Sequence, residues 1–344
     1  MDDTGCSDSG QGGILKNESI ITRNLITGGA GFIGSHLAEA LIAQGQQVVA
    51  MDNLSTGRIE NLASLMSHSS FQFVYETIHN ETVMDRLVSN CDVIYHLAAA
   101  VGVELIIHDP VHTIETNLIG TEMVLRLARR YRKKVLIASS SEVYGKSDAI
   151  PYREDADRVM GPTIKSRWSY AESKAMDEFL ALAYHKQFGV PVVICRFFNT
   201  VGPRQTGTYG MVIPRLVQQA LAGEPLTVYG DGQQTRCFCS VQDTVRAVVG
   251  LAVEPRAVGE IFNVGSVEEI TILDLARRVL DRTGSSSQIR LIPYDQAYEA
   301  GFEDMRRRVP DTGKIRAWIG WQPTVSLDQT LDQVIAQFRS ARSG

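Results

Sequence analysis

Tyr170 and Lys174 have the types and spacing of a general base and the cation that activates it. Residues four apart on a helix lie on one face, so Lys174 can lie over the Tyr170 ring. A nearby ammonium favours the phenolate and lowers the pKa of a tyrosine from about 10 toward neutrality. The phenol then becomes a general base that can take a proton from a hydroxyl group. Because tyrosine and lysine are also common on solvated helix faces, this interpretation depends on the rest of the chain.

A run of serines behind an apolar segment supplies the first support. Residues 135–138 are rich in branched side chains, which predicts a buried parallel strand, and three serines (139–141) follow with Glu142. Open α/β sheets bind ligands at the carboxyl ends of their strands. We therefore expect Ser140 to bind the same substrate hydroxyl as Tyr170, although a run of serines alone is more typical of a turn.

A glycine-rich turn upstream indicates the cofactor. Gly28, Gly31 and Gly34 follow the apolar run 20–26 and precede a helical pattern over 35–43, which is the setting of a dinucleotide-binding turn. Gly28 permits the tight turn, Gly31 lets the backbone approach a pyrophosphate, and Gly34 allows the helix to pack closely on the strand. The spacing is G-x-x-G-x-x-G, and an ordinary strand–helix turn is the alternative.

The residue that selects between dinucleotides is Asp52. It ends a second apolar strand, residues 48–52, and lies 18 residues after Gly34. A carboxylate at this point accepts hydrogen bonds from the ribose hydroxyls and repels a 2′-phosphate. The sequence therefore favours NAD over NADP.

The composition limits the partners and the location. The chain has 344 residues, 44% of them hydrophobic, and a net charge of −5 that argues against nucleic acid or an acidic membrane as a partner. It shows no apolar run near the ~18 residues of a membrane span and no signal-peptide pattern, so we expect a cytoplasmic protein. The five cysteines are scattered, which indicates reduced thiols, and neither they nor the histidines form a metal-ligand pattern.

The order of the elements predicts an α/β fold. Apolar strands alternate with helical patterns over residues 20–199, which predicts a Rossmann-type doubly wound parallel sheet that binds NAD. Residues 1–19 lack periodicity and are expected to form a disordered tail. Shorter elements with more glycine and proline predict a smaller C-terminal substrate-binding domain, formed by residues 200–237 and 264–344.

Together these features resemble the extended short-chain dehydrogenase/reductase family, which contains NAD-dependent nucleotide-sugar epimerases, dehydratases and decarboxylases. The resemblance runs from about Asn24 to the C-terminus, and residues 223–236 are similar to the nucleotide clamp of the family. It implies that residues 238–263 return to the NAD-binding domain, and that Tyr170 and Lys174 also contact the cofactor. The further cofactor contacts that it implies are Phe32, Ile33, Asn53, Ser55, Thr56, Gly57, Leu97, Ala98 and Ala99.

The same resemblance implies a UDP-sugar substrate and a homodimer. Arg236 follows the glycine-rich nucleotide loop and is suited to pair with a diphosphate. Dimers of the family pack two helices of each subunit together, here residues 110–131 and 169–188. The apolar side chains at helical spacing that could form this dimer interface, or could equally face the sheet, are Val124, Leu127, Ala128, Phe179, Leu182 and Ala183. The other implied substrate contacts are Asn199, Arg204, Arg215, Val228, Tyr229 and Gln234.

Residues next to Ser140 favour one reaction of the family. In these enzymes a sugar C4 hydroxyl is oxidised to a ketone, from which epimerisation, dehydration or decarboxylation follows. Dehydratases carry Asp-Glu where this chain has Ser141-Glu142, so dehydration is disfavoured. The sequence over 140–142 resembles the Thr-Ser-Glu of UDP-glucuronate decarboxylases. Arg308 aligns with their arginine at the sugar-carboxylate end of the pocket.

Other positions divide between the alternatives. Residues 167–169 also occur in a bacterial branch of the decarboxylases, and Thr206 stands where uronate 4-epimerases tend to carry an arginine. Against this, residues 100–104 lack the Pro and Tyr that are usual in decarboxylases, and Val309 replaces a lysine. By itself, Glu142 could be a helix cap or a solvated acid.

We therefore expect NAD-dependent decarboxylation of UDP-glucuronate through a 4-keto intermediate, giving UDP-xylose or a UDP-4-keto-pentose. Ser140, Glu142, Tyr170, Lys174 and Arg308 are the expected catalytic residues, although Arg308 could be a surface charge of the cluster 306–308. One alternative is a 4-epimerase acting on UDP-glucose or UDP-glucuronate. The other is an NAD-binding redox sensor without catalysis, against which the intact tyrosine, lysine and serine count.

Overall fold

A parallel sheet of seven strands forms the centre of the computed structural model, which describes residues 21–101, 109–207, 211–297 and 305–343. The strand order is β11-β6-β5-β4-β1-β2-β3, and all the pairs are parallel. This order is the doubly wound Rossmann arrangement with one added strand, so the predicted fold class is confirmed. The strands are β1 (Arg23–Thr27), β2 (Gln47–Asp52), β3 (Phe71–Tyr75), β4 (Val93–His96), β5 (Lys134–Ser140), β6 (Val192–Phe197) and β11 (Glu260–Val264).

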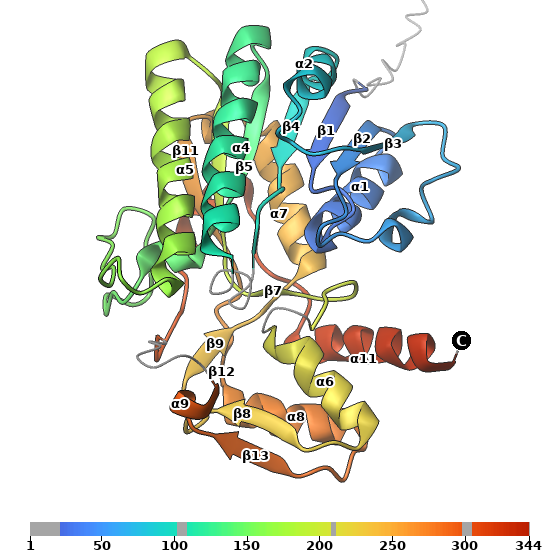
Figure 1. Ribbon diagram of the computed structural model, residues 1–344, viewed down its shortest axis with the longest axis vertical. Coiled ribbons are helices and arrows are strands. Elements are labelled where there is room, and N and C mark those ends of the chain that lie inside the picture. The colour runs from blue at the N-terminus through green and yellow to red at the C-terminus, as the bar shows by residue number, and fades with distance from the viewer. Residues whose placement is uncertain (1–20, 102–108, 208–210, 298–304, 344) are drawn as a thin grey trace, which may run out of the picture.

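Helices cover both faces of this sheet (Figure 1). Successive residues of a strand point to opposite faces, and Leu25 and Ile26 accordingly belong to two different apolar clusters. Both side chains are fully buried, so the strands read as continuous apolar runs rather than as alternating ones. One face is covered by α1 (Phe32–Ala43) and α7 (Val241–Val253), and the other by α2 (Glu81–Ser89), α4 (Pro110–Tyr131) and α5 (Arg167–Phe188).

A third apolar cluster forms a smaller lobe below the sheet in the view of Figure 1. Its pairs of strands are β8 (Leu226–Tyr229) with β13 (Ile289–Ile292) and β9 (Thr235–Cys237) with β12 (Glu269–Thr271). Two residues of β7 (Thr200–Val201) pair with β10 (Cys239–Ser240). Its helices are α6 (Val212–Ala222), α8 (Ile272–Thr283), α9 (Tyr294–Ala297) and α11 (Leu327–Ser343).

The chain passes between the two lobes more than once. Strand β11 lies at the edge of the large sheet beside β6, and α10 (Gly313–Ile319) packs on β11, where Trp318 meets the Phe262 ring at a centroid distance of 5.3 Å. Residues 313–319 thus contact the large sheet, although they fall within the segment assigned to the smaller domain. The domain boundaries stay a prediction, and the predicted tail, residues 1–19, lies outside the described residues.

Helix α5 ends where its sequence predicts and carries the Tyr170–Lys174 pair. Gly189 follows its last turn with φ +70°, a left-handed conformation that glycine adopts without strain. The helix packs beside α4 on the face of the sheet that also contacts α2 (Figure 1). Within the described part of the chain, no helix is both long and apolar enough to span a bilayer.

The faces of α4 and α5 correct part of the dimer prediction. Val124, Leu127 and Ala128 are fully buried against the sheet, so they are not offered to another subunit. Leu182 also packs against this core, whereas Phe179 is 61% exposed. Ala183 is exposed as well. The apolar spacing of a helix identifies a covered face, but it does not say which neighbour covers it.

Candidate active site

A cavity of about 640 Å³ lies at the carboxyl ends of the strands, between the sheet and the smaller lobe. It brings together most of the residues that the sequence predicted. The exceptions are Gly57, Lys174 and Val228, which do not line it. The predicted cofactor residues on its wall are Gly28, Gly31, Phe32, Ile33, Gly34, Asp52, Asn53, Ser55, Thr56, Leu97, Ala98, Ala99 and Tyr170. The predicted substrate and catalytic residues on its wall are Ser140, Glu142, Asn199, Arg204, Arg215, Tyr229, Gln234, Arg236 and Arg308.

The glycine-rich turn is too tightly packed for side chains at two of its three positions. A Cβ on Gly28, which has φ +71°, would lie 2.8 Å from the backbone nitrogen of Ala98. A Cβ on Gly34 would lie 2.2 Å from the Gly28 carbonyl oxygen, so the helix can pack this closely on the turn only with glycine at position 34. At Gly31 a Cβ would meet the Gly28 carbonyl alone, at 3.1 Å, and would otherwise extend toward the cavity. These roles match the three positions of a dinucleotide turn.

Asp52 holds two loops of the cofactor end together. Its carboxylate accepts hydrogen bonds from the backbone N–H of Ala30 (3.0 Å) and of Leu54 (2.8 Å), and burial raises its pKa above the usual value. Gly57 packs against the same carboxylate, since a Cβ there would lie 2.8 Å from Asp52 Oδ2. A carboxylate has about four acceptor positions, so Asp52 retains capacity for ribose hydroxyls. The fit of the turn and of this acid to NAD supports the expected cofactor.

The Tyr170–Lys174 pair is deeply buried, and this burial shifts the pKa of Tyr170 in the direction opposite to the one expected. Tyr170 is 9% exposed and Lys174 is 2% exposed. Burial raises the pKa of Tyr170 above its usual value, although the Lys174 ammonium and the Ser140 hydroxyl both act to lower it. The predicted lowering toward neutrality is therefore wrong for the protein alone, because desolvation of the phenolate outweighs the neighbouring cation.

Asp177 is a partner of Lys174 that the sequence interpretation missed. Lys174 Nζ donates to Asp177 Oδ2 at 2.9 Å, and the two side chains are 3% and 0% exposed. Burial acts to lower the pKa of Lys174, but the Asp177 carboxylate outweighs it and the pKa lies above the usual value. The signal in the sequence was the acid three residues after Lys174 on the same helix face.

A buried histidine lies behind this pair. His96 bonds through its two ring nitrogens to Thr27 Oγ1 (2.8 Å) and Thr121 Oγ1 (3.1 Å). Burial, with Lys174 nearby, lowers the pKa of His96 to about 3, so it is neutral at physiological pH. His96 therefore has a structural role, as a hydrogen-bonding link between β1 and α4.

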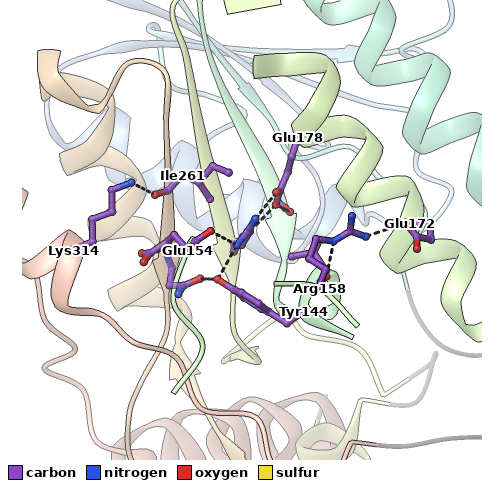
Figure 2. A network of polar contacts seen from close by, with 11 residues as sticks. Tyr144, Glu154, Arg158, Glu172, Glu178, Ile261 and Lys314 are labelled. Atoms are coloured by element: carbon purple, nitrogen blue, oxygen red, sulfur yellow. Dashed lines mark hydrogen bonds and ion pairs between the residues drawn. The ribbon is translucent and has the colours of Figure 1, made fainter. Parts of the chain in front are cut away.

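The end of β5 is anchored by a second buried ion pair. Arg196 contacts both oxygens of Glu178, at 2.9 and 2.7 Å, and Ser139 donates to the same carboxylate. Arg196 also donates to the Tyr144 hydroxyl at 2.8 Å, which in turn donates to Asn263 Oδ1 on β11 at 2.7 Å. Figure 2 shows Tyr144 and Glu178 in this network of polar contacts. Because Ser139 and Tyr144 bracket residues 140–143, the network fixes the segment that carries Ser140 and Glu142.

Ser140 and Glu142 both line the cavity; Ser140 is the last residue of β5, and Glu142 lies in a short 3-10 helix, η2 (Ser141–Tyr144). The Ser140 hydroxyl accepts from the Glu142 N–H at 3.2 Å, so the serine is the cap and Glu142 is not. Glu142 Oε1 lies 2.7 Å from Arg308 Nη2, and Glu142 Oε2 lies 3.5 Å from Arg167 Nη1. Burial acts to raise the pKa of Glu142, but the two guanidiniums outweigh it and lower the pKa to about 2. Glu142 is therefore an anion at neutral pH.

Arg308 is a buried side chain and not part of a solvated cluster. Its side chain is 7% exposed, whereas those of Arg306 and Arg307 are 81% and 56% exposed. The segment that carries Arg308 is held by two backbone hydrogen bonds to Tyr152. The Tyr152 N–H donates to the Val309 carbonyl and the Asp311 N–H donates to the Tyr152 carbonyl, both at 2.8 Å. The surface alternative for Arg308 is thus excluded.

The smaller lobe places most of the predicted substrate contacts on the opposite wall. Arg236 is 8% exposed and donates to the Met305 carbonyl at 2.9 Å, and Gln234 donates to the Tyr229 carbonyl at 2.9 Å. The Arg215 guanidinium lies over the Tyr229 ring, 4.1 Å from its centroid. Val228 is fully buried in the core of the smaller lobe, so its side chain is not available to a ligand.

Asn199 and Arg204 hold the connection between the lobes. Asn199 donates to the Cys237 carbonyl at 2.9 Å. The Arg204 guanidinium pairs with Glu39 of α1 at 2.7 Å, and the backbone N–H of Arg204 donates to Gln337 Oε1 of α11 at 2.6 Å. Both residues line the cavity while making these structural contacts.

Among the described residues, no cluster of three or more His, Cys, Asp or Glu could hold a metal ion. Gly102 to Glu104, on which one argument against decarboxylation relied, lie outside the described residues.

A doubly wound sheet, a glycine turn followed by an acid, and a buried Tyr–Lys pair beside a serine define an extended short-chain dehydrogenase/reductase. Comparison with known families agrees, since the model described as "GDP-mannose 4,6 dehydratase" matches residues 25–334. The chain belongs to this family of the extended short-chain dehydrogenases/reductases.

Relatives within the family carry two kinds of name. A Bacillus cytotoxicus protein named UDP-N-acetyl-alpha-D-glucosaminuronate decarboxylase is 44% identical over 92% of this chain and 98% of its own length. The Danio rerio protein named UDP-glucuronic acid decarboxylase 1 is 39% identical over 92% of this chain and 72% of its own length. A crystal structure of UDP-glucuronic acid 4-epimerase from Bacillus cereus, in complex with UDP-glucuronic acid and NAD, matches with a TM-score of 0.84 and 32% identity. That match covers 93% of this chain and 99% of the other.

Proposed function

We propose that this protein is an NAD-dependent decarboxylase of UDP-linked uronic acids, with UDP-glucuronate as its substrate. The observation that carries the proposal is the Glu142–Arg308 ion pair on the wall of the cavity that Ser140 and Tyr170 also line. This pair supports the proposal because the Arg308 guanidinium, a suitable partner for a substrate carboxylate, lines the same cavity as Tyr170, the proposed base for a C4 hydroxyl. Relatives that carry decarboxylase names over 92% of the chain support the same reaction.

The cofactor end fits NAD through the glycine turn and Asp52, and bound NAD would supply the acceptor for the hydride that leaves C4. Tyr170 takes the proton of the C4 hydroxyl, and Ser140 holds that hydroxyl beside it. The ketone at C4 makes the C6 carboxylate a β-keto acid, so the C5–C6 bond breaks with release of CO2 and leaves an enolate.

The ionic state of Glu142 restricts its role in this reaction. With a pKa of about 2, it is not a proton donor in the free protein. It acts instead as the anion that holds Arg308 in place, at 2.7 Å. A reduction of the 4-keto product would give UDP-xylose, and its release would give a UDP-4-keto-pentose.

Two observations define the competing substrates and reactions. The relative at 44% identity bears the name of a UDP-N-acetyl-glucosaminuronate decarboxylase, which makes the 2-acetamido uronate the second candidate substrate. The epimerase structure at 32% identity represents the competing 4-epimerase reaction. Thr206 lines the cavity at the position where uronate 4-epimerases tend to carry an arginine, which favours decarboxylation.

The deciding assay follows CO2 release and the NADH absorbance with NAD and either UDP-glucuronate or UDP-N-acetyl-glucosaminuronate. Release of CO2 from UDP-glucuronate is the expected result. Release of CO2 from UDP-N-acetyl-glucosaminuronate alone would show that the acetamido uronate, and not UDP-glucuronate, is the substrate. Formation of UDP-galacturonate with an intact carboxylate would show an epimerase and refute decarboxylation.

We also propose a cytoplasmic homodimer. Exposed apolar side chains gather on α4 and α5, among them Ile119 (49% exposed), Met176 (50%) and Phe179 (61%). Phe179→Glu would place a charge on this face, so we expect a wild-type dimer and a monomeric variant by light scattering at micromolar concentration. Val253→Glu, at a 77% exposed position on α7, is the control and stays dimeric. A monomeric wild type would refute the dimer.

The cysteines support the proposed location. Cys91, Cys195, Cys237 and Cys239 are buried free thiols, which suits a reducing compartment.

A further inference from the structure

A buried polar bridge joins the loop after β4 to the helix that carries the proposed base. Its members come from four elements and are each no more than 1% exposed; they are Thr27 (β1), His96 (β4), Thr121 (α4) and Asp177 (α5). The bridge begins beside the glycine turn, where the Ala98 N–H donates to Thr27 Oγ1 at 3.3 Å and a Cβ on Gly28 would approach the same nitrogen to 2.8 Å. It ends at Lys174 Nζ, 2.9 Å from Asp177 Oδ2.

The middle of this buried bridge is formed by His96 and Thr121. The imidazole lies between two hydroxyls, with Nδ1 2.8 Å from Thr27 Oγ1 and Nε2 3.1 Å from Thr121 Oγ1. Helix α4 packs beside α5, and burial raises the pKa of Asp177, which the Lys174 ammonium and the Thr121 hydroxyl, as hydrogen-bond donors, act to lower. Thr121 thus connects His96 to the partner of Lys174.

The donors and acceptors of these groups give the buried bridge a single direction. A hydroxyl has one proton to donate, and an ionised carboxylate has none. When Thr121 donates to Asp177, its oxygen can only accept from His96, so the proton of the neutral imidazole is on Nε2. Nδ1 is then an acceptor, so Thr27 donates to it and accepts from the Ala98 N–H. Every hydrogen bond therefore points toward Asp177, and bonds in such a chain strengthen one another.

We propose that Thr121 is a positioning residue for Lys174, because its hydroxyl completes the buried bridge and fixes the carboxylate that holds the ammonium. A lysine side chain is a flexible stem with a charged end, so its place beside the Tyr170 phenol depends on what holds that end. Thr121 does not line the cavity, and it acts through Asp177 rather than on the substrate. The inference rests on the proposed oxidation at C4 by Tyr170, with which decarboxylation and epimerisation both begin.

The direction of the buried bridge is tested first, without substrate. NMR of protein that contains isotope-labelled histidine distinguishes the two neutral tautomers of the imidazole, and the His96 signals are identified by their loss in His96→Gln. The expected result at neutral pH is an uncharged His96 with its proton on Nε2. A proton on Nδ1 would overturn the proposal, because Thr121 could not then accept from His96 while it donates to Asp177.

The activity test compares side chains at position 121 that differ in one group. Thr121→Val keeps the shape and removes the hydroxyl, whereas Thr121→Ser keeps the hydroxyl and removes the methyl group. If the valine variant does not fold, Thr121→Ala takes its place, since it differs from the serine variant in the hydroxyl alone. Thr330→Val is the control, because Thr330 is 1% exposed on α11, donates to the Ser326 carbonyl at 2.9 Å and does not line the cavity.

Thr121→Val is expected to lower kcat with UDP-glucuronate about tenfold, the effect of one hydrogen bond to a charged group. The KM and the Kd for NAD, measured by calorimetry, should each change less than about threefold, because neither ligand contacts this hydroxyl. Thr121→Ser should recover most of kcat, and Thr330→Val should change none of these values. An unchanged kcat in Thr121→Val, an equal loss in Thr121→Ser, or a loss of NAD binding of the same size as the loss of kcat would overturn the role of Thr121.

The proposed function fails separately. A wild type that converts UDP-glucuronate to UDP-galacturonate refutes decarboxylation, and kcat for that epimerisation then gives the same comparison of the Thr121 variants. If only the acetamido uronate releases CO2, it replaces UDP-glucuronate in the test. The His96 tautomer is measured without substrate, so a proton on Nδ1 overturns the role of Thr121 even where the proposed reaction is confirmed.

Discussion

The Lys174–Asp177 pair allows a sharp test of how the buried charges of this active site are stabilised. The two side chains are 3% and 0% exposed, and their charged atoms lie 2.9 Å apart. Removal of one member leaves the other as an uncompensated charge in the core, which typically costs about 3–5 kcal/mol. Replacement of both by apolar side chains of similar size is often neutral, because no charge then remains to be desolvated.

We therefore expect Lys174→Met and Asp177→Leu each to lower the free energy of unfolding by about 3–5 kcal/mol, and the double variant to lose less than either single one. The assay is urea unfolding followed by the fluorescence of Trp168, Trp318 and Trp321. The double variant should fold and remain inactive, because it lacks the lysine that accompanies Tyr170.

An exposed pair provides the matched control. The charged atoms of Arg130 and Asp85 lie 2.7 Å apart, and their side chains are 57% and 34% exposed. Arg130→Met and Asp85→Leu should each change the unfolding free energy much less than the single variants of the buried pair do. If the single variants of the buried pair cost no more than this control, or if their costs simply add in the double variant, the reasoning about desolvation is wrong.

Three further results are expected. Tyr170→Phe should reduce turnover by about 10²–10⁴-fold, the usual contribution of a general base, while NAD binding measured by calorimetry is retained; near-normal turnover would exclude Tyr170 as the base. Glu142→Gln should keep the initial formation of NADH but slow the release of CO2, because a neutral amide holds Arg308 less firmly; equal slowing of both steps would contradict this division of roles. The folded pKa of Glu142 is about 2 against a usual 4.5, so its ionic stabilisation is present above pH 4.5 and is lost as the pH falls toward 2. As the pH falls through that window, the wild type should accordingly lose unfolding free energy that Glu142→Gln does not lose, as measured by acid-unfolding curves.

Local patterns in the sequence predicted the cofactor end of the site well. The turn at Gly28 and Gly34, the acid at Asp52 and the four-residue spacing of Tyr170 and Lys174 are set by short-range geometry, so a single segment contains the whole signal. The alternating strands and helices likewise predicted the doubly wound sheet.

Features that depend on tertiary packing could not be predicted from the sequence. Arg308 lies in a run of three arginines, and its burial, with both neighbours exposed, depends on contacts with residues distant in sequence such as Tyr152 and Glu142. The pKa of Tyr170 was misjudged because burial of the phenol exceeds the effect of Lys174, and a local spacing carries no information about burial. The spacing of Val124 fitted either a subunit interface or the sheet, because helical periodicity indicates a covered face without indicating which neighbour covers it.

The late position of Arg308 in the chain has a consequence for how the site is assembled during synthesis. The residues that bind the cofactor and carry the base are translated first, yet the Arg308–Ser141 contact spans 167 residues of sequence. Strand β11, which also closes the edge of the sheet beside β6, is likewise translated after most of the sheet. The segments of the glycine turn and of the Tyr–Lys pair are therefore synthesised well before Arg308. The wall of the cavity that Arg308 forms with Ser141 and Glu142 is completed only after residue 308 has left the ribosome.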